Sequence, residues 1–164
     1  MDVLIGLGGN LGDVRGAFAA ATSRLAEIGV VAGVSRSFRT RPVGPPQPDF
    51  LNAALVLDCG RALGELLQLC RDVERAAGRD RLSEARWGPR PLDVDLLLVR
   101  GAVHRSPRLV LPHPRFHERP FALVPAAEVA GQWTHPLVGK SVAQLAADGL
   151  AREPEAVEAV VENG

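Results

Sequence analysis

The chain has 164 residues, which is enough for one domain with a substantial hydrophobic core. Its 19 Lys and Arg residues balance 19 Asp and Glu residues, and this zero net charge disfavours a general nucleic-acid-binding protein, because such proteins are usually basic. Cys59 and Cys70 form no C-x-x-C pair, no apolar run approaches 18 residues and no signal peptide is visible, so we expect a cytoplasmic protein with free thiols and no membrane segment.

The first part of the chain predicts strands around one helix. Residues 3–7 are an apolar run typical of a central strand. Asp13 is placed to cap a helix, whose apolar residues recur at helical spacing: Val14, Phe18, Ala21, Leu25 and Ile28. Residues 30–38 alternate in polarity and predict one strand, with these residues on its buried face: Val30, Ala32, Val34 and Phe38. Residues 41–49 contain four prolines and a glycine, so we expect a loop.

The middle of the chain repeats this pattern. Residues 51–57 predict a strand and residues 63–77 an amphipathic helix closed by Gly78. A loop over 79–91 then leads into a strand that begins near Asp93. The resulting order, β-α-β-β-α-β, predicts an α+β fold with a ferredoxin-like core, in which helices pack on an antiparallel sheet.

The remaining residues predict additions to this core. Helices are expected near 120–130 and around 141–147, after a stretch rich in proline and histidine. The acidic, proline-broken tail is expected to fray. We therefore expect a single domain over residues 1–150 and a frayed tail over 151–164.

The most informative segment is RWGPRPLDVDLLL, residues 86–98. Asp93 and Asp95 are two apart in an otherwise apolar strand, so both carboxylates face the same side, roughly 7 Å apart along the backbone. Two like charges at that distance repel by about 2 kcal/mol at an effective dielectric constant of 20, so a nearby cation is expected. Four arginines precede the pair: Arg79, Arg81, Arg86 and Arg90. Carboxylates suit Mg²⁺ and arginines suit phosphate, so the segment predicts a metal–nucleotide site. The alternative is a solvated edge strand behind an arginine-rich surface loop.

Three other features of the sequence are weaker indications of a binding site. The glycine-rich segment 6–12 lacks the spacing of a dinucleotide-binding motif, so we expect a tight turn in which Asn10 bonds to backbone. His113 and His117 are four apart, but neighbouring prolines prevent the regular helix that a zinc pair would need. Glu74, on the inward side of its helix, either pairs with Arg79 or Arg81 or accepts hydrogen bonds from a ligand; the sequence leaves both open.

Four motifs in order resemble one family. They are GLGGNLGD near the start, FRTRPVGPPQPDFLNAAL at 38–55, RWGPRPLDVDLLL at 86–98 and LPHPRFHERPFALVP at 111–125. Together they resemble the 6-hydroxymethyl-7,8-dihydropterin pyrophosphokinases (2-amino-4-hydroxy-6-hydroxymethyldihydropteridine diphosphokinases) of folate biosynthesis. The resemblance covers about residues 3–145.

The resemblance implies a role for each matching residue. The expected metal ligands, for two Mg²⁺ ions, are Asp93 and Asp95, and the expected catalytic residues add Arg81 and Arg90. Residues expected to contact ATP are Glu74, Arg79, Arg81, Trp87, Arg90, Leu96, Arg108, His113 and Arg119. Residues expected to contact the pterin are Thr40, Pro42, Val43, Phe50, Asn52, Trp87 and Phe121. The chain departs from the family pattern at Arg41, Phe50, Arg71, Val110 and Pro114.

The implied reaction moves the β,γ-diphosphate of ATP to the hydroxymethyl oxygen of the dihydropterin and releases AMP. The expected partners are these two small molecules, without nucleic acid or membrane, and the expected state is a monomer. The rival interpretation is a non-catalytic ferredoxin-like module that binds RNA. The few aromatic residues and the neutral charge argue against it, and Mg²⁺-dependent binding of an ATP analogue distinguishes the two.

Overall fold

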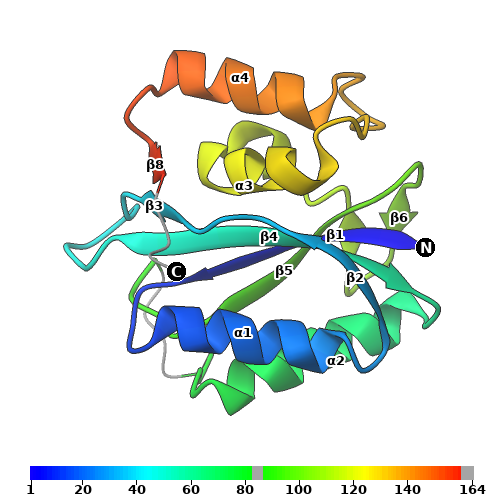
Figure 1. Cartoon of the computed structure of the whole chain (residues 1–164), viewed down its shortest axis with the longest axis horizontal. Coiled ribbons are helices and arrows are strands. Elements are labelled where there is room, and N and C mark those ends of the chain that lie inside the picture. Colours follow the sequence, from blue (N-terminus) through cyan, green and yellow to red (C-terminus); the bar gives the residue numbers. More distant parts are fainter. Residues whose placement is uncertain (83–86, 160–164) are drawn as a thin grey trace.

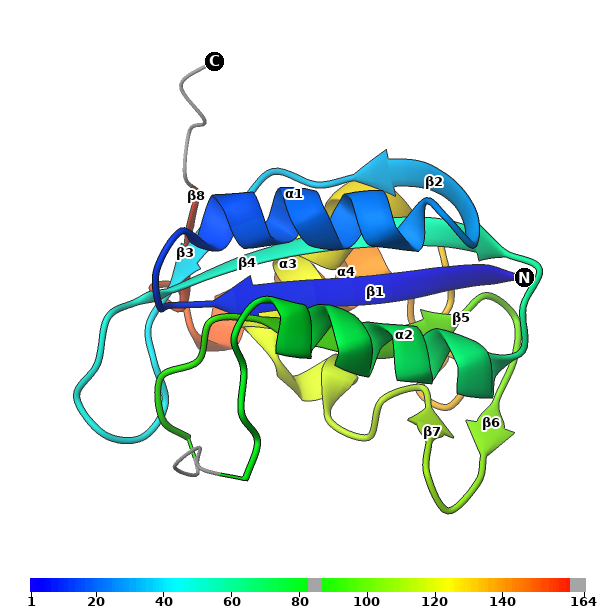
Figure 2. The same ribbon diagram turned by 90° about the horizontal axis from the view of Figure 1, so that it is seen from below.

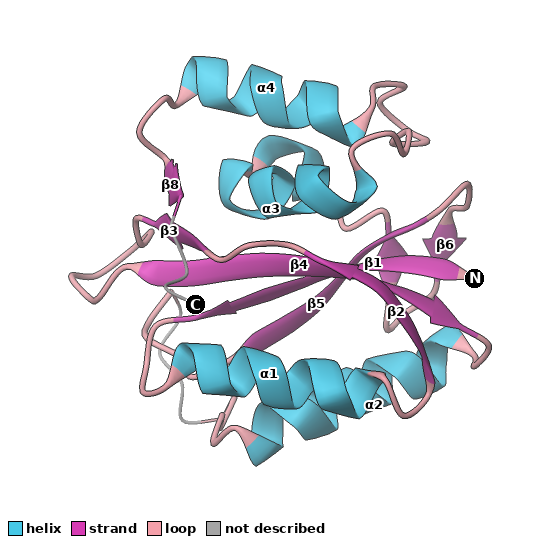
Figure 3. Ribbon diagram, viewed as in Figure 1, coloured by secondary structure: helices cyan, strands magenta, loops and turns pink. Residues whose placement is uncertain are grey.

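The computed structural model describes residues 1–82 and 87–159. A six-stranded antiparallel sheet separates two helical layers (Figures 1 and 3). Its strands are β1 (Asp2–Gly9), β2 (Gly29–Val34), β3 (Phe38–Thr40), β4 (Phe50–Cys59), β5 (Asp93–Val99) and β8 (Val157–Ala159). The helices are α1 (Val14–Leu25), α2 (Leu63–Ala76), α3 (Pro120–Ala130) and α4 (Val142–Arg152), with a 3₁₀ turn, η1 (Phe116–Glu118). A separate small ribbon pairs β6 (His104–Arg105) with β7 (Val110–Leu111).

The strand order is β5-β1-β4-β3-β8, and β2 pairs with β4 beside β3. Helices α1 and α2 cover one face of the sheet, and α3 covers the other, with α4 packed on the outer side of α3 (Figure 1). Each face has its own apolar core, because alternate residues of the central strands point to opposite sides. In β1, for example, Val3 and Ile5 face α1 and α2, whereas Leu4 faces α3. Asp93 is the first residue of β5.

Local sequence signals explain most element boundaries. The Asp13 carboxylate accepts a hydrogen bond from the Gly16 N–H at 3.0 Å and so caps α1, as expected. Gly78 follows α2 with φ 95°, the left-handed conformation that glycine adopts at helix ends. None of the helices in the described ranges is long and apolar enough to cross a membrane.

The expectation of one strand over 30–38 is wrong. Between β2 and β3 the Ser35 N–H still donates to the Ala54 carbonyl at 2.8 Å. The Ser35 hydroxyl, however, accepts the Ala54 N–H at 2.8 Å, and the Arg36 N–H donates to Glu128 at 2.9 Å, so side chains take the place of two ladder partners. The predicted buried face is also wrong for β2, where Val30 and Val34 are 67% and 51% exposed. A register shift between Val31 and Gly33 accompanies this change.

The C-terminal boundaries differ as well. Helix α4 runs to Arg152 rather than ending near 147, and Ser141 caps it by accepting the Gln144 N–H at 3.1 Å. The expectation of a frayed tail does not hold for Val157–Ala159, which pair with β3 as β8. The extent of the domain, 1–150, stays a prediction.

Candidate active site

The paired carboxylates lie at the start of β5, on the face of the sheet covered by α3. Asp93 and Asp95 line a small cavity of about 50 Å³ together with Gly8, Asn52 and His113. Arg119 and Phe121, at the beginning of α3, close it from the other side. The same-side placement expected from the strand period is therefore present.

The two carboxylates differ in their partners. The Asp93 carboxylate accepts a short ion-paired hydrogen bond from Arg79, and Arg90 approaches it at 3.3 Å. No hydrogen bond or ion pair within the described part of the chain reaches the Asp95 carboxylate, which lies in the fields of Arg79, Arg81 and Arg119. Asp95 is thus a half-buried carboxyl group without a direct partner among the described residues.

Both carboxyl groups bind protons more tightly than in water. Burial, followed by the charge of Asp95, raises the pKa of Asp93 to about 6, although Arg79 and Arg90 oppose the shift. Burial, followed by the charge of Glu74, raises the pKa of Asp95. A site whose carboxylates resist ionisation in this way has a deficit of positive charge, and a cation there would remove it.

Glu74 connects α2 to this site from the edge of the sheet. Its side chain is only 2% exposed and accepts hydrogen bonds from Arg79 at 2.8 Å and from Arg81 at 2.8 Å. It also accepts the backbone N–H of Val94 at 3.0 Å, a donor on the outer side of edge strand β5. Of the two alternatives for Glu74, the structure contains the arginine pairing, with both predicted partners at once.

The loops after α2 and before β4 meet at the same end of the sheet (Figure 2). Asn10 joins them: its amide donates to the Gln47 side chain and to the Pro48 carbonyl at 2.9 Å each, and its Oδ1 accepts the Arg90 N–H at 2.9 Å. Gln47 in turn donates to the Trp87 carbonyl at 2.7 Å. The sequence predicted that Asn10 bonds to backbone, but not that it links three loops.

Close packing of glycines permits this arrangement. A Cβ at Gly9 would lie 2.5 Å from the Pro91 carbonyl oxygen, and one at Gly44 would lie 2.6 Å from Trp87 Cβ. Trp87 has a left-handed backbone, φ 61°, which bulky residues rarely adopt. The loop 79–91 is therefore tied down in its described part, and Arg86 lies outside the described residues.

The residues expected at the pterin lie beside the carboxylates. The Asn52 amide donates to the Thr40 hydroxyl at 2.6 Å, and both side chains are buried. The Phe50 ring lies 6.0 Å from the Arg90 guanidinium carbon, and the Phe121 ring lies 5.6 Å from that of Arg119. A second cavity, of about 490 Å³, lies on the other side of Phe121 and contains two further predicted residues, Pro42 and Val43.

Two predicted nucleotide contacts lie away from the carboxylate cavity, and a third lies within it. Leu96 is buried in the core under α1 and α2, so its side chain faces away from the carboxylate cavity. Arg108 is exposed in the turn between β6 and β7, beyond the far end of β5, and no described contact joins it to Asp93. His113 lies in the cavity, where burial, followed by the charge of Arg119, lowers its pKa.

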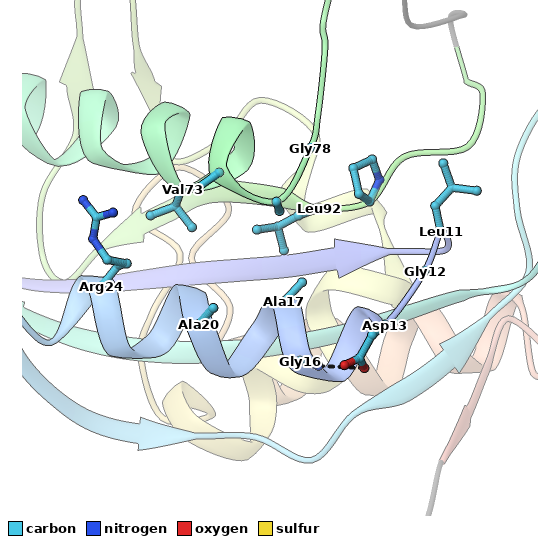
Figure 4. Close-up of a pocket in the computed structure, with 13 residues that line it drawn as sticks. Leu11, Gly12, Asp13, Gly16, Ala17, Ala20, Arg24, Val73, Gly78 and Leu92 are labelled. Carbon is cyan, nitrogen blue, oxygen red and sulfur yellow. Dashed lines mark hydrogen bonds between the residues drawn. The ribbon is translucent and has the colours of Figure 1, made fainter.

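A larger groove, of about 660 Å³, lies between α1 and α2 on the opposite face of the sheet (Figure 4). Small side chains line it, such as Gly16, Ala17 and Ala20, with Arg24 at one end. It contains none of the predicted site residues. Within the described residues no group of three or more His, Cys, Asp or Glu side chains could hold a metal ion.

The chain is similar to known proteins over most of its length. Residues 4–131 match the family model described as 7,8-dihydro-6-hydroxymethylpterin-pyrophosphokinase (HPPK). A protein of Synechocystis sp. named 2-amino-4-hydroxy-6-hydroxymethyldihydropteridine pyrophosphokinase is 42% identical over 147 residues, which are 87% of this chain and 73% of that one. A protein of Methylorubrum extorquens with the same name is 45% identical over 129 residues, which are 77% of this chain and 80% of that one.

The fold is shared with a solved structure. The HPPK-DHPS A437G protein of Plasmodium falciparum, crystallised with STZ-DHP, superposes with a TM-score of 0.69 at 11% identity. The match covers 94% of this chain and 46% of that one, so this chain spans about half of that larger protein.

Proposed function

The chain belongs to the 7,8-dihydro-6-hydroxymethylpterin-pyrophosphokinase family of transferases in folate biosynthesis, and we propose that it moves the β,γ-diphosphate of ATP to the hydroxymethyl oxygen of 6-hydroxymethyl-7,8-dihydropterin in a Mg²⁺-dependent reaction. In this reaction the hydroxymethyl oxygen forms a bond to the β-phosphorus. The bond from that phosphorus to the α,β-bridging oxygen breaks, AMP leaves with the bridging oxygen, and the hydroxyl proton passes to solvent.

The observation that carries the proposal is the Asp95 carboxylate, half-buried beside Asp93 and without a hydrogen bond or ion pair in the described chain. Two oxygen-donor carboxylates with raised pKa values fit Mg²⁺, which proteins commonly hold through one or two carboxylates plus substrate phosphates. We expect two ions there. Bound Mg²⁺ would neutralise part of the negative charge on the phosphate oxygens.

Three arginines and one histidine surround the proposed path of the diphosphate. Arg90 lies beside Asp93, Arg119 and His113 line the cavity, and Arg81 extends from Glu74 with a half-exposed side chain. Phosphoryl transfer depends mainly on positioning and charge stabilisation, so these groups can act without covalent chemistry. His113 is suited to donate a hydrogen bond as a neutral ring, because its pKa is lowered. Glu74 and Arg79 hold each other and act as support for Arg81 and Asp93.

The pterin is assigned to the cavity side formed by Asn52, Thr40 and Phe121. An amide and a hydroxyl that already bond to each other at 2.6 Å present both donors and acceptors to the edge of a flat heterocycle. Phe121 and Phe50 offer aromatic faces for stacking. Trp87, Pro42 and Val43 belong to the loops that border this side, and Leu96 and Arg108 are assigned to the nucleotide by the resemblance alone.

The finer description of the fold supports the same proposal. The order β5-β1-β4-β2 of mutually antiparallel strands, with α1 and α2 on one face, is what a ferredoxin-like β-α-β-β-α-β core has. We propose that the protein acts as a monomer in the cytoplasm on these two small molecules, without a nucleic-acid partner.

The test is the identity of the nucleotide product. The purified chain is incubated with ATP, Mg²⁺ and the dihydropterin, and the nucleotides are separated by chromatography. We expect AMP in equal amount to the pterin diphosphate, and no AMP when the pterin or the metal is omitted. ADP as the main product would mean an ordinary kinase, and no product with any pterin would contradict the assignment.

A further inference from the structure

We infer that the C-terminal segment, residues 153–159, is part of the pterin side of the site and positions Thr40 and the loop that follows it. This inference rests on the proposed function. The segment lies outside the family match, which ends at residue 131, so the similarity assigns it no role.

The first observation is the pairing of β8 with β3. Val157 lies opposite Thr40, and Glu158 lies opposite Arg39. On its other side Thr40 lies opposite Phe50 of β4. The backbone of Thr40 is therefore held between two strands, and without β8 it would belong to a three-residue edge strand with unpaired backbone groups.

The second observation is a shared cavity wall. The cavity of about 490 Å³ beside Phe121 is bounded on one side by Thr40, Pro42 and Val43 and on the other by residues 153–156. These three predicted pterin residues thus share this cavity with the C-terminal segment. Removal of the segment would remove one wall of this cavity next to Phe121.

Charge pairs follow the same seam. Arg41 pairs with Glu155 at 3.4 Å, and Arg39 lies 3.9 Å from Glu158. All four side chains are more than half exposed, so each pair contributes little free energy. The backbone pairing is therefore the main restraint, and the charges align the two segments.

The consequence concerns the bond between Thr40 and Asn52. This bond presets the orientation of the buried amide that we assign to the pterin edge. A restrained Thr40 keeps the amide oriented before the pterin arrives, so less ordering accompanies binding. Thr40 and Asn52 touch the pterin in this scheme, and the C-terminal residues are positioning residues.

The experiment compares two shortened chains. One ends at Arg152 and lacks β8, and the matched control ends at Ala159 and keeps it. For each, the dissociation constant of the dihydropterin is measured by calorimetry with Mg²⁺ and a non-hydrolysable ATP analogue present, and the constant of the analogue is measured separately. A third variant keeps the full length and carries Val157→Pro and Glu158→Pro, which remove the N–H donors of β8 on whichever side they point.

We expect the chain that ends at Arg152 and the double-proline variant to bind the pterin about tenfold more weakly, a change of about 1.4 kcal/mol. Their affinity for the analogue should stay within about twofold of the full chain, and the Ala159 control should match the full chain in both. Equal pterin binding with and without β8, or an equal loss for both ligands, would overturn the inference. If the full chain itself fails to bind the pterin, the proposed function is wrong and the inference falls with it.

Discussion

The environment of Asp95 is the clearest indication that the carboxylate pair has a functional rather than a structural role. Arg79 donates hydrogen bonds to both Asp93 and Glu74. Asp95, in contrast, is half-buried with no hydrogen bond or ion pair from the described residues. A charge in that position lowers stability unless a cation accompanies it. The free protein therefore tolerates a destabilising residue at this position.

Asp95→Asn should accordingly raise the melting temperature of the ligand-free protein while it lowers kcat by at least about a thousandfold, because a metal site supplies several kcal/mol of charge stabilisation. The two readouts are thermal denaturation without Mg²⁺ and AMP release with both substrates. Asp148→Asn, on exposed α4, serves as the control and should leave kcat unchanged. Near-normal turnover of Asp95→Asn would rule out the metal assignment.

We expect His135, on the loop between α3 and α4, to make the stability of the protein depend on pH, independently of catalysis. Its ring is 2% exposed, and its Nδ1 accepts the N–H groups of Leu137 and Val138 at 3.2 Å each, so the proton resides on Nε2. Burial, followed by the neighbouring His117, lowers the pKa of His135 below its ordinary 6.5. The unfolded chain therefore takes up this proton at higher pH than the folded chain does.

Stability from neutral His135 should be complete above pH 6.5 and should decrease as the pH falls below that value. The measurement is the difference in melting temperature between pH 7.5 and pH 5.5 for the wild type and for His135→Leu. We expect a smaller difference in the variant, and His104→Asn, at the partly exposed ribbon, should behave like the wild type. An unchanged difference in His135→Leu would mean that His135 does not contribute.

At the level of elements, Glu74 connects helix α2 to strand β5 and positions two arginines. Glu74 covers an edge-strand donor, Val94 N–H, and at the same time binds Arg79 and Arg81. The two arginines differ in burial: the Arg79 side chain is 4% exposed and the Arg81 side chain 45%. One acceptor thus holds a structural arginine and an arginine that can reach a ligand.

We expect alanine substitution of Arg79 to affect mainly stability and that of Arg81 to affect mainly catalysis. Arg79→Ala should lower the free energy of unfolding by about 3 kcal/mol, because it leaves buried carboxylates without their partner. Arg81→Ala should change it by less than about 1 kcal/mol and should lower kcat more than ATP affinity, since its contact is expected mainly in the transition state. Urea denaturation and a nucleotide titration beside steady-state kinetics give these values. A loss of ATP affinity as large as the loss of kcat/KM, with kcat unchanged, would make Arg81 an ordinary binding residue.

The elements that the sequence predicts well are those whose signals are local. Helix α2 has apolar residues at helical spacing and a terminal glycine, and β5 is apolar apart from Asp93 and Asp95, so both appear where expected. The segment 30–38 fails because Ser35 and Arg36 replace ladder bonds with partners in β4 and α3, which no local pattern reveals. The pairing of β8 with β3, more than a hundred residues apart, is missed for the same reason.

At the level of the whole molecule, the site is assembled from segments that meet only in the folded chain. The motif around Asp93 predicts that the two carboxylates face the same side of β5. The residues expected to contact the pterin come from the family resemblance instead. Asn10 was predicted only as a turn residue, although it joins the β1–α1 turn to two loops, through Pro48 and Arg90. An asparagine in a glycine-rich turn carries no signal for such distant partners.

Asn10→Ala should therefore affect both loops at once. It removes three side-chain hydrogen bonds, to Gln47, Pro48 and Arg90, and we expect a loss of about 2 kcal/mol in stability. We also expect faster amide exchange at Gln47 in one loop and at Gly88 and Arg90 in the other. Since one loop borders the proposed pterin and the other carries Arg90, KM for the pterin should rise and kcat should fall. Asp13→Ala, which removes only the α1 cap, is the matched control: it should lower stability by about 1 kcal/mol without a change in exchange at either loop. Faster exchange at a single loop in Asn10→Ala would show that the two loops are held independently.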